Sequence, residues 1–78
     1  MSMLEVKRLL YAWQEVKSSS AGPQEHLKAE IAYHEAASEY WDNQVGSSLT
    51  YSDAHCTKKW VYHQAQRDAA WLKLQKAT

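Results

Sequence analysis

The chain contains few of the residues that interrupt or cross-link a polypeptide. Its 78 residues include two glycines, one proline and one cysteine. The lone Cys56 excludes an intramolecular disulfide framework and suits a reducing compartment. Gly22 and Pro23 fall at one place and Gly46 at another, which leaves three long stretches without helix breakers. We therefore expect one small domain, residues 1–78, made of three helices.

Long apolar runs and an excess charge of one sign are also missing. No segment approaches the roughly 18 consecutive apolar residues of a membrane span. Charges at Glu5, Lys7 and Arg8 interrupt the apolar run that a signal peptide needs near its start. Nine basic and nine acidic residues cancel, which argues against a protein built mainly to grip a phosphate backbone. We expect a cytoplasmic protein that makes no membrane contact.

The hydrophobic periodicity predicts an all-α fold, with antiparallel helices of which the third is the longest. The expected helices cover residues 3–17, 23–42 and 51–76. Ser2 and Glu5 have the spacing of a capping box at the first helix, and Pro23 suits the first turn of the second. Thr50 and Asp53 resemble a capping box at the third.

The third expected helix has two apolar stripes. The first contains Cys56, Trp60, Trp71 and Leu74, and the second contains Val61, Ala65, Ala69 and Leu72. A helix with two stripes usually contacts two neighbours, either the other two helices of the domain or a second copy of the chain. We expect self-association into a helical-bundle oligomer. The expected core comprises Leu10, Trp13, Leu27, Ile31, Trp60 and Leu72.

Three polar residues fall inside the apolar face of the second expected helix. His26, Glu30 and His34 are spaced by four residues, so they lie in one line. Such a line must be hydrogen-bonded, paired or placed at a partner surface. Its eight-residue span is about 12 Å, too long for one metal ion to bind both imidazoles. We predict a buried polar or interface triad that holds no metal.

The histidines of this triad predict a response to pH. An ionised Glu30 would favour a proton on a neighbouring imidazole, so stability or oligomerisation should change between about pH 5 and 8. Replacing Glu30 with Gln should then flatten that response. A short internal match also involves the histidines: Tyr33-His34 resembles Tyr62-His63, although the flanking residues do not support a duplication.

No group of residues has the pattern of a catalytic site. His55 and Cys56 are adjacent, so on a helix their side chains point about 100° apart. The two isolated glycines cannot form a phosphate-binding loop. We expect no enzymatic activity, no cofactor and no small-molecule substrate.

The aromatic content favours a protein-binding surface. The chain has four Trp, five Tyr and no Phe, and Trp and Tyr are enriched at protein interfaces. We expect a small accessory or inhibitory regulator, similar in size and composition to those that phages and mobile elements encode. The aromatic residues expected near the surface, where they would bind a partner protein, are Tyr33, Tyr40, Trp41, Tyr51 and Tyr62.

The third helix also supports an alternative, a nucleic-acid-associated regulator. Basic side chains interleaved with aromatic rings can bind backbone and bases. The basic side chains that would contact the nucleic acid are Lys58, Lys59, Arg67 and Lys73. They are distributed around the helix, and the preceding loop is too long for a helix-turn-helix motif.

Overall fold

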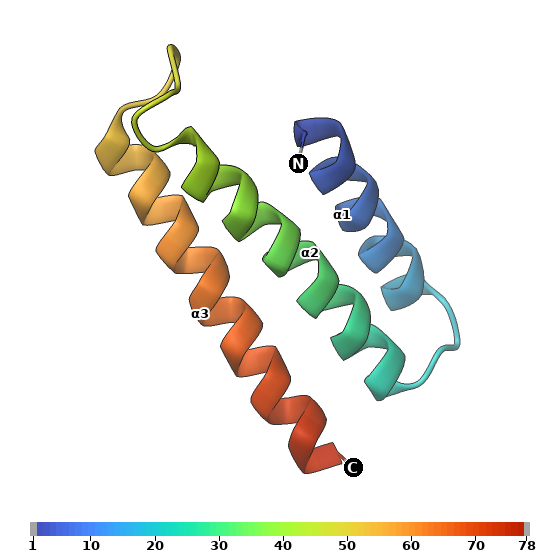
Figure 1. Cartoon of the computed structure of the whole chain (residues 1–78). Helices are drawn as coiled ribbons and strands as arrows, with labels where there is room; N and C mark the ends of the chain where they lie inside the picture. Colours follow the sequence, from blue (N-terminus) through green and yellow to red (C-terminus); the bar gives the residue numbers. More distant parts are fainter. Residues whose placement is uncertain (1, 78) are drawn as a thin grey trace.

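A computed structural model describes residues 2–77, with side chains for residues 2–76. It contains three α-helices: α1 (Met3–Ser18), α2 (Pro23–Gln44) and α3 (Asp53–Ala77). Consecutive helices run antiparallel, and α3 is the longest (Figure 1). The all-α, three-helix fold expected from the sequence is confirmed. Within residues 2–77 no helix is long and apolar enough to cross a membrane.

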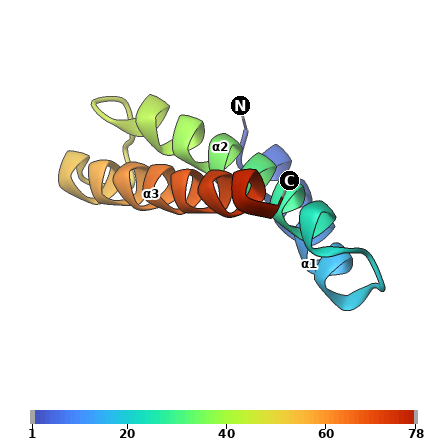
Figure 2. The same ribbon diagram turned by 90° about the horizontal axis from the view of Figure 1, so that it is seen from below.

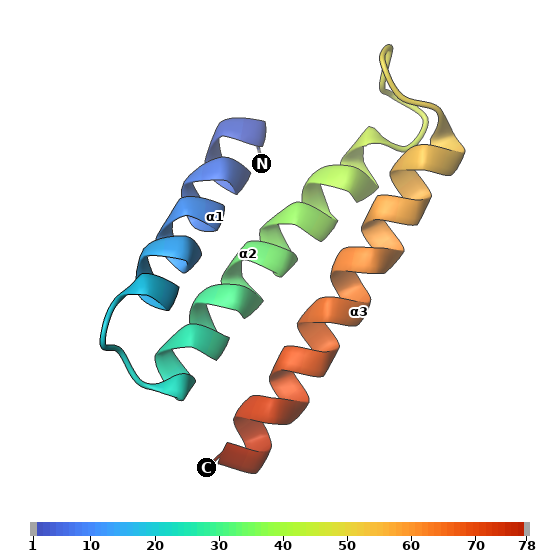
Figure 3. The same ribbon diagram turned by 180° about the vertical axis from the view of Figure 1, so that it is seen from behind.

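The three helices form a single layer with α2 in the middle (Figures 1 and 3). Helix α2 packs against both outer helices, whereas the backbones of α1 and α3 stay apart over residues 2–77. Seen from below, α3 is nearest and α1 lies on the far side of α2 (Figure 2). The overall dimensions of 41 × 23 × 15 Å reflect this flat arrangement.

Small side chains of α2 make up much of the core. Ala36, Ala37 and Ser38 are all buried, and Val6 of α1 packs against the two alanines. Small residues let helices approach closely, but they bury little apolar area each. The core is therefore modest, and partly buried neighbours complete it, namely Met3, Leu9, Tyr33 and Tyr40.

The helix starts follow the expected capping chemistry at α1 but not at α3. The Glu5 amide donates to Ser2 Oγ at 3.3 Å, which confirms the predicted cap. At α3 the His55 amide donates to Ser52 Oγ at 3.1 Å, so Ser52 is the cap and Thr50 is not. Asp53 instead accepts a hydrogen bond from the Gly46 amide at 2.8 Å and ties the loop to the helix. Gly46 has a φ of 79°, a conformation that favours glycine.

The predicted core is correct for Ile31, which is buried, but wrong for Leu72. Leu72 is 55% exposed because it lies on the side of α3 that faces away from α2. Among residues 53–76 of α3, the buried ones are Cys56, His63 and Ala70, which share one face of the helix. Four other expected core residues are only partly buried, namely Leu10, Trp13, Leu27 and Trp60.

Replacing Trp13 with Ala tests the packing of α1 on α2. The Trp13 ring stacks on Tyr33 with centroids 5.6 Å apart and meets His34 edge-on at the same distance. Replacing a fully buried Trp with Ala costs about 3–5 kcal/mol. Because Trp13 is only partly buried, Trp13→Ala should lower the free energy of unfolding by somewhat less. The matched control, Leu4→Ala, removes a side chain of α1 that is 61% exposed and should change stability by less than about 0.5 kcal/mol. Urea unfolding that shows equal effects of both changes would contradict this packing.

Candidate functional site

Two buried histidines join α2 to α3. His34 of α2 and His63 of α3 are both buried, and their Nδ1 atoms lie 2.9 Å apart. At this distance the Nδ1–H of one ring donates to the Nδ1 lone pair of the other, so the contact holds one proton. A second proton there would place two N–H groups head to head. The arrangement therefore requires at least one neutral imidazole.

Glu30 continues this pair, but His26 does not. The Glu30 Oε2 atom lies 3.6 Å from His34 Nε2, one helical turn away on α2. The Nε2 atom of His26 is buried, and no hydrogen-bond partner lies within reach of it among residues 2–77. The predicted line of His26, Glu30 and His34 is thus divided. The third polar residue beside Glu30 and His34 is instead His63 of α3, which the match between Tyr33-His34 and Tyr62-His63 could have suggested.

Aromatic rings surround the two imidazoles. The Tyr33 ring centroid is 4.9 Å from that of His34 and 5.6 Å from that of His63. Tyr62 lies 5.1 Å from His63, and Trp13 of α1 also contacts His34. The cluster therefore draws side chains from all three helices into one largely apolar environment.

This environment lowers the pKa of both histidines. Burial lowers the pKa of His34, although the nearby Glu30 carboxylate acts in the opposite direction. Burial lowers the pKa of His63 to about 4, and His34 and Lys59 contribute in the same direction. For His34, desolvation of the charged ring outweighs the attraction of the Glu30 carboxylate, so the expectation that a histidine beside Glu30 holds its proton does not apply to this ring.

A second aromatic cluster lies where α2 meets the beginning of α3. The Trp41 ring is 5.2 Å from Tyr51 and 5.5 Å from His55, and Tyr51 stacks on His55 at 4.9 Å. Trp41 is only 8% exposed, so its expected position at the surface is wrong. Tyr40, which also contacts Trp41, is partly buried.

Among the five predicted partner-binding aromatics, Tyr51 and Tyr62 are exposed. Tyr33 and Tyr40 are partly buried because they pack against the core. Further exposed apolar side chains lie on α1 and in the loop between α2 and α3, namely Leu4, Tyr11, Val45 and Leu49. A line of exposed residues, among them Val61 and Leu72, also runs along the side of α3 opposite α2. We call this line of residues the outer seam; it consists of Ala54, Lys58, Val61, Ala65, Asp68 and Leu72, all of which are exposed.

The predicted nucleic-acid residues do not form one continuous surface. Lys58 and Lys59 line an open pocket of about 420 Å³ together with His55 and Tyr62. Arg67 is instead directed at the neighbouring carboxylate, with its Nη2 atom 3.1 Å from Asp68 Oδ1. Lys73 is exposed farther along α3.

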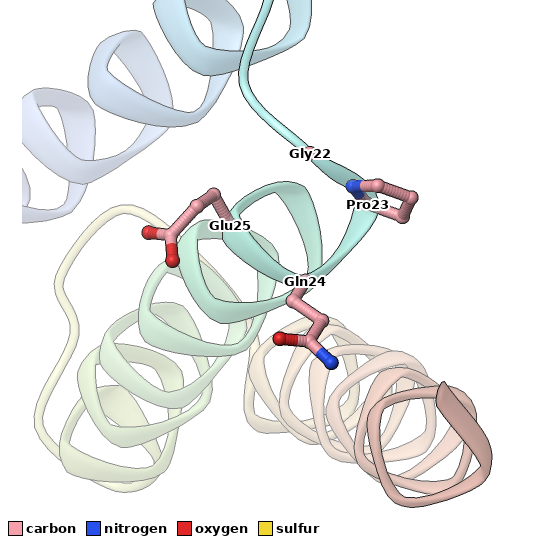
Figure 4. Close-up of a pocket in the computed structure, with 4 residues that line it drawn as sticks. All are labelled: Gly22, Pro23, Gln24 and Glu25. Atoms are coloured by element: carbon pink, nitrogen blue, oxygen red, sulfur yellow. The ribbon is translucent and has the colours of Figure 1, made fainter. Parts of the chain in front are cut away.

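A second open pocket, of about 370 Å³, lies at the start of α2 and is lined by Gly22, Pro23, Gln24 and Glu25. Figure 4 shows Gln24 directed towards α3 and Glu25 directed away from it. Within residues 2–77 no group of three His, Cys, Asp or Glu side chains could hold a metal ion.

Comparison with known proteins adds no relative: no protein-family model, curated protein or solved structure matches the chain.

The histidine pair predicts a loss of stability in acid. An unfolded histidine titrates near pH 6.5, whereas His63 in the folded chain has a pKa of about 4. Between these values the unfolded chain binds a proton that the folded chain excludes. The contribution of His63 to the free energy of unfolding is therefore fully present above about pH 6.5. It is lost as the pH drops towards about 4, by about 3 kcal/mol. Urea unfolding across this range measures the slope.

Substitutions separate the contributions to this slope. His63→Gln should reduce the slope to the part that His34 contributes, whereas His55→Gln, which changes a partly exposed histidine on the same helix, should leave the slope in place. Glu30→Gln should steepen the loss, because the carboxylate raises the pKa of His34. The sequence alone predicts the opposite, that Glu30→Gln flattens the response to pH. Stability that is constant or increases as the pH falls would contradict this interpretation of the pair.

Chelation provides a separate prediction. Untagged protein should contain no stoichiometric zinc or iron, and a chelator should leave its melting temperature unchanged. A structural metal would instead stabilise the fold and be lost to the chelator with a drop in melting temperature. Elemental analysis that finds one metal per chain or per dimer would contradict the prediction.

Proposed function

We propose that this chain is a non-enzymatic protein-binding regulator, of the accessory or inhibitory kind, which receives its partner on the outer seam of α3. One observation carries the proposal. Val61 and Leu72 are 54% and 55% exposed on the side of α3 against which no other helix of residues 2–77 packs. Exposed apolar side chains on a helix face that no other helix covers are candidates for an interaction site.

The modest size of the core supports the same function. The buried apolar residues include three alanines, Ala36, Ala37 and Ala70, beside a few larger side chains. A chain of this size buries a smaller share of its surface than a larger domain does. A partner that covers the outer seam would add apolar burial at roughly 25 cal/mol per Å², so binding and folding would stabilise each other.

The histidines support a structural role more than a catalytic one. His34 and His63 are buried and directed at each other, whereas a general base must reach the proton of a bound substrate. Their rings stabilise the α2–α3 contact, and the partner-binding surface lies on the opposite side of α3.

A nucleic-acid function remains the second candidate because Lys58, Lys59 and Tyr62 line one open pocket. Two observations weigh against it. Arg67 is paired with Asp68, and the formal net charge of the chain is zero. Affinity for a phosphate backbone depends on the number of cations that contact it.

Affinity capture from the native host distinguishes the two functions. We expect the chain to retain a protein, its own or another, with little change between about 50 and 200 mM salt, a range over which phosphate contacts weaken steeply. Val61→Ser with Leu72→Ser should abolish retention, since both changes place a hydroxyl in the apolar surface. Leu4→Ser, on the exposed side of α1, is the matched control.

Retention of nucleic acid that is lost with salt and with Lys58→Ala and Lys59→Ala would support the second candidate instead. Retention that survives the double change on α3, or that the Leu4 control abolishes equally, would contradict binding through the outer seam.

A further inference from the structure

We propose that the outer seam binds a second copy of this chain, and that the two α3 helices pair antiparallel about a twofold axis near residue 63. This inference rests on the proposed function because it uses the same surface, and it names the occupant. Two observations support a second copy as the occupant: the order of residues along the seam and their exposure.

The seam has the spacing of a helix–helix contact. Its positions, 54, 58, 61, 65, 68 and 72, are separated alternately by four and three residues, which is the repeat by which one helix packs along another. Four of the six residues are apolar. The other two, Lys58 and Asp68, carry opposite charges and lie at equal distances from position 63.

An antiparallel alignment centred on residue 63 is self-complementary. Lys58 of one copy faces Asp68 of the other, and the twofold axis repeats this pair. Val61 faces Ala65, so larger and smaller apolar side chains meet in the middle. Ala54 faces Leu72 in the same way towards the ends. The seam positions correspond alternately to the d and a positions of a heptad. Each facing pair therefore places an a position opposite a d position, as in antiparallel coiled coils.

The charges also disfavour the other orientation. In a parallel pair in register, Lys58 would face Lys58 and Asp68 would face Asp68, so both contacts would be repulsive. Next to the centre of the antiparallel pair, Tyr62 of one copy would lie level with Gln64 of the other. This arrangement brings no like charges together. Facing charges of this kind determine orientation more than affinity.

The local structure leaves both charged groups at the surface. Asp68 Oδ1 accepts hydrogen bonds from Arg67 Nε and Nη2 at 3.2 and 3.1 Å, and the Asp68 side chain is still 68% exposed. Lys58 is exposed and lines the open pocket beside Tyr62. A second α3 can therefore reach both residues without any change in the packing of α3 on α2.

A charge exchange tests the inference. Light scattering over a concentration series should show the parent chain passing from 9.0 kDa to about twice that mass. Lys58→Glu or Asp68→Lys alone should weaken the dimer by about tenfold or more, because each change creates two like-charge contacts. The two changes together should restore it. Lys59→Glu, the same charge change one position along and outside the seam, is the matched control, and circular dichroism checks that each variant is helical.

Every outcome bears on the proposal. A parent chain that stays monomeric at all concentrations overturns it, as do single variants that dimerise like the parent. A folded double variant that fails to dimerise overturns the antiparallel pairing. If the parent is monomeric but retains a different protein through Val61 and Leu72, this inference fails and the proposed function stands. If it is monomeric and retains nothing, both fail.

Discussion

Over residues 2–77, helix α2 packs against two neighbours, while α1 and α3 each pack against one. This constraint determines which surfaces of the molecule are buried. Residues on much of the circumference of α2 are buried or partly buried, and the small side chains of Ala36, Ala37 and Ser38 let the flanking helices approach. On α3, by contrast, one face packs against α2 and the opposite face remains exposed. The seam available for a second copy is a direct consequence of the single-layer arrangement.

The contact between His34 and His63 favours one alignment of α3 on α2. If α3 slipped by one turn, each imidazole would lose its partner within an environment of aromatic rings, and an unsatisfied buried polar group is costly. Apolar side chains at these two positions would tolerate such a slip more readily. The pair thus favours one alignment, and its sensitivity to acid follows from the same burial. The alignment in turn fixes which residues of α3 face away from α2.

The sequence predicted the elements well because the signals for them are local. Glycine occurs only between the helices and proline only at the first position of α2. The cap at Ser2 depends on a residue three positions away. The proximity of Glu30 and His34 follows equally from their spacing on one helix. These features require no knowledge of how the helices pack.

Apart from the cap of α3, which is Ser52 and not Thr50, the errors concern contacts between elements. Both stripes of α3 are apolar, so the sequence could not show whether the face containing Cys56 or the face containing Leu72 packs against α2. The sequence places Trp41 at the surface, but Tyr51 near the end of the following loop and His55 at the start of α3 cover it. The partner of His34 lies 29 residues away in the sequence. Periodicity assigns residues to a face of a helix and does not say what that face contacts.

The antiparallel pairing of two α3 helices is the central claim, and distances between spin labels on the two copies test it most directly. With Cys56 replaced by Ala, a label on Gln64→Cys would lie next to the twofold axis, and a label on Lys76→Cys would lie far from it. At 1.5 Å per residue, the two labels at position 76 should be separated by about 39 Å along the helix axis, whereas those at position 64 should be close together. Short distances at both positions would show a parallel pair and contradict the account, as would the absence of any coupling between copies.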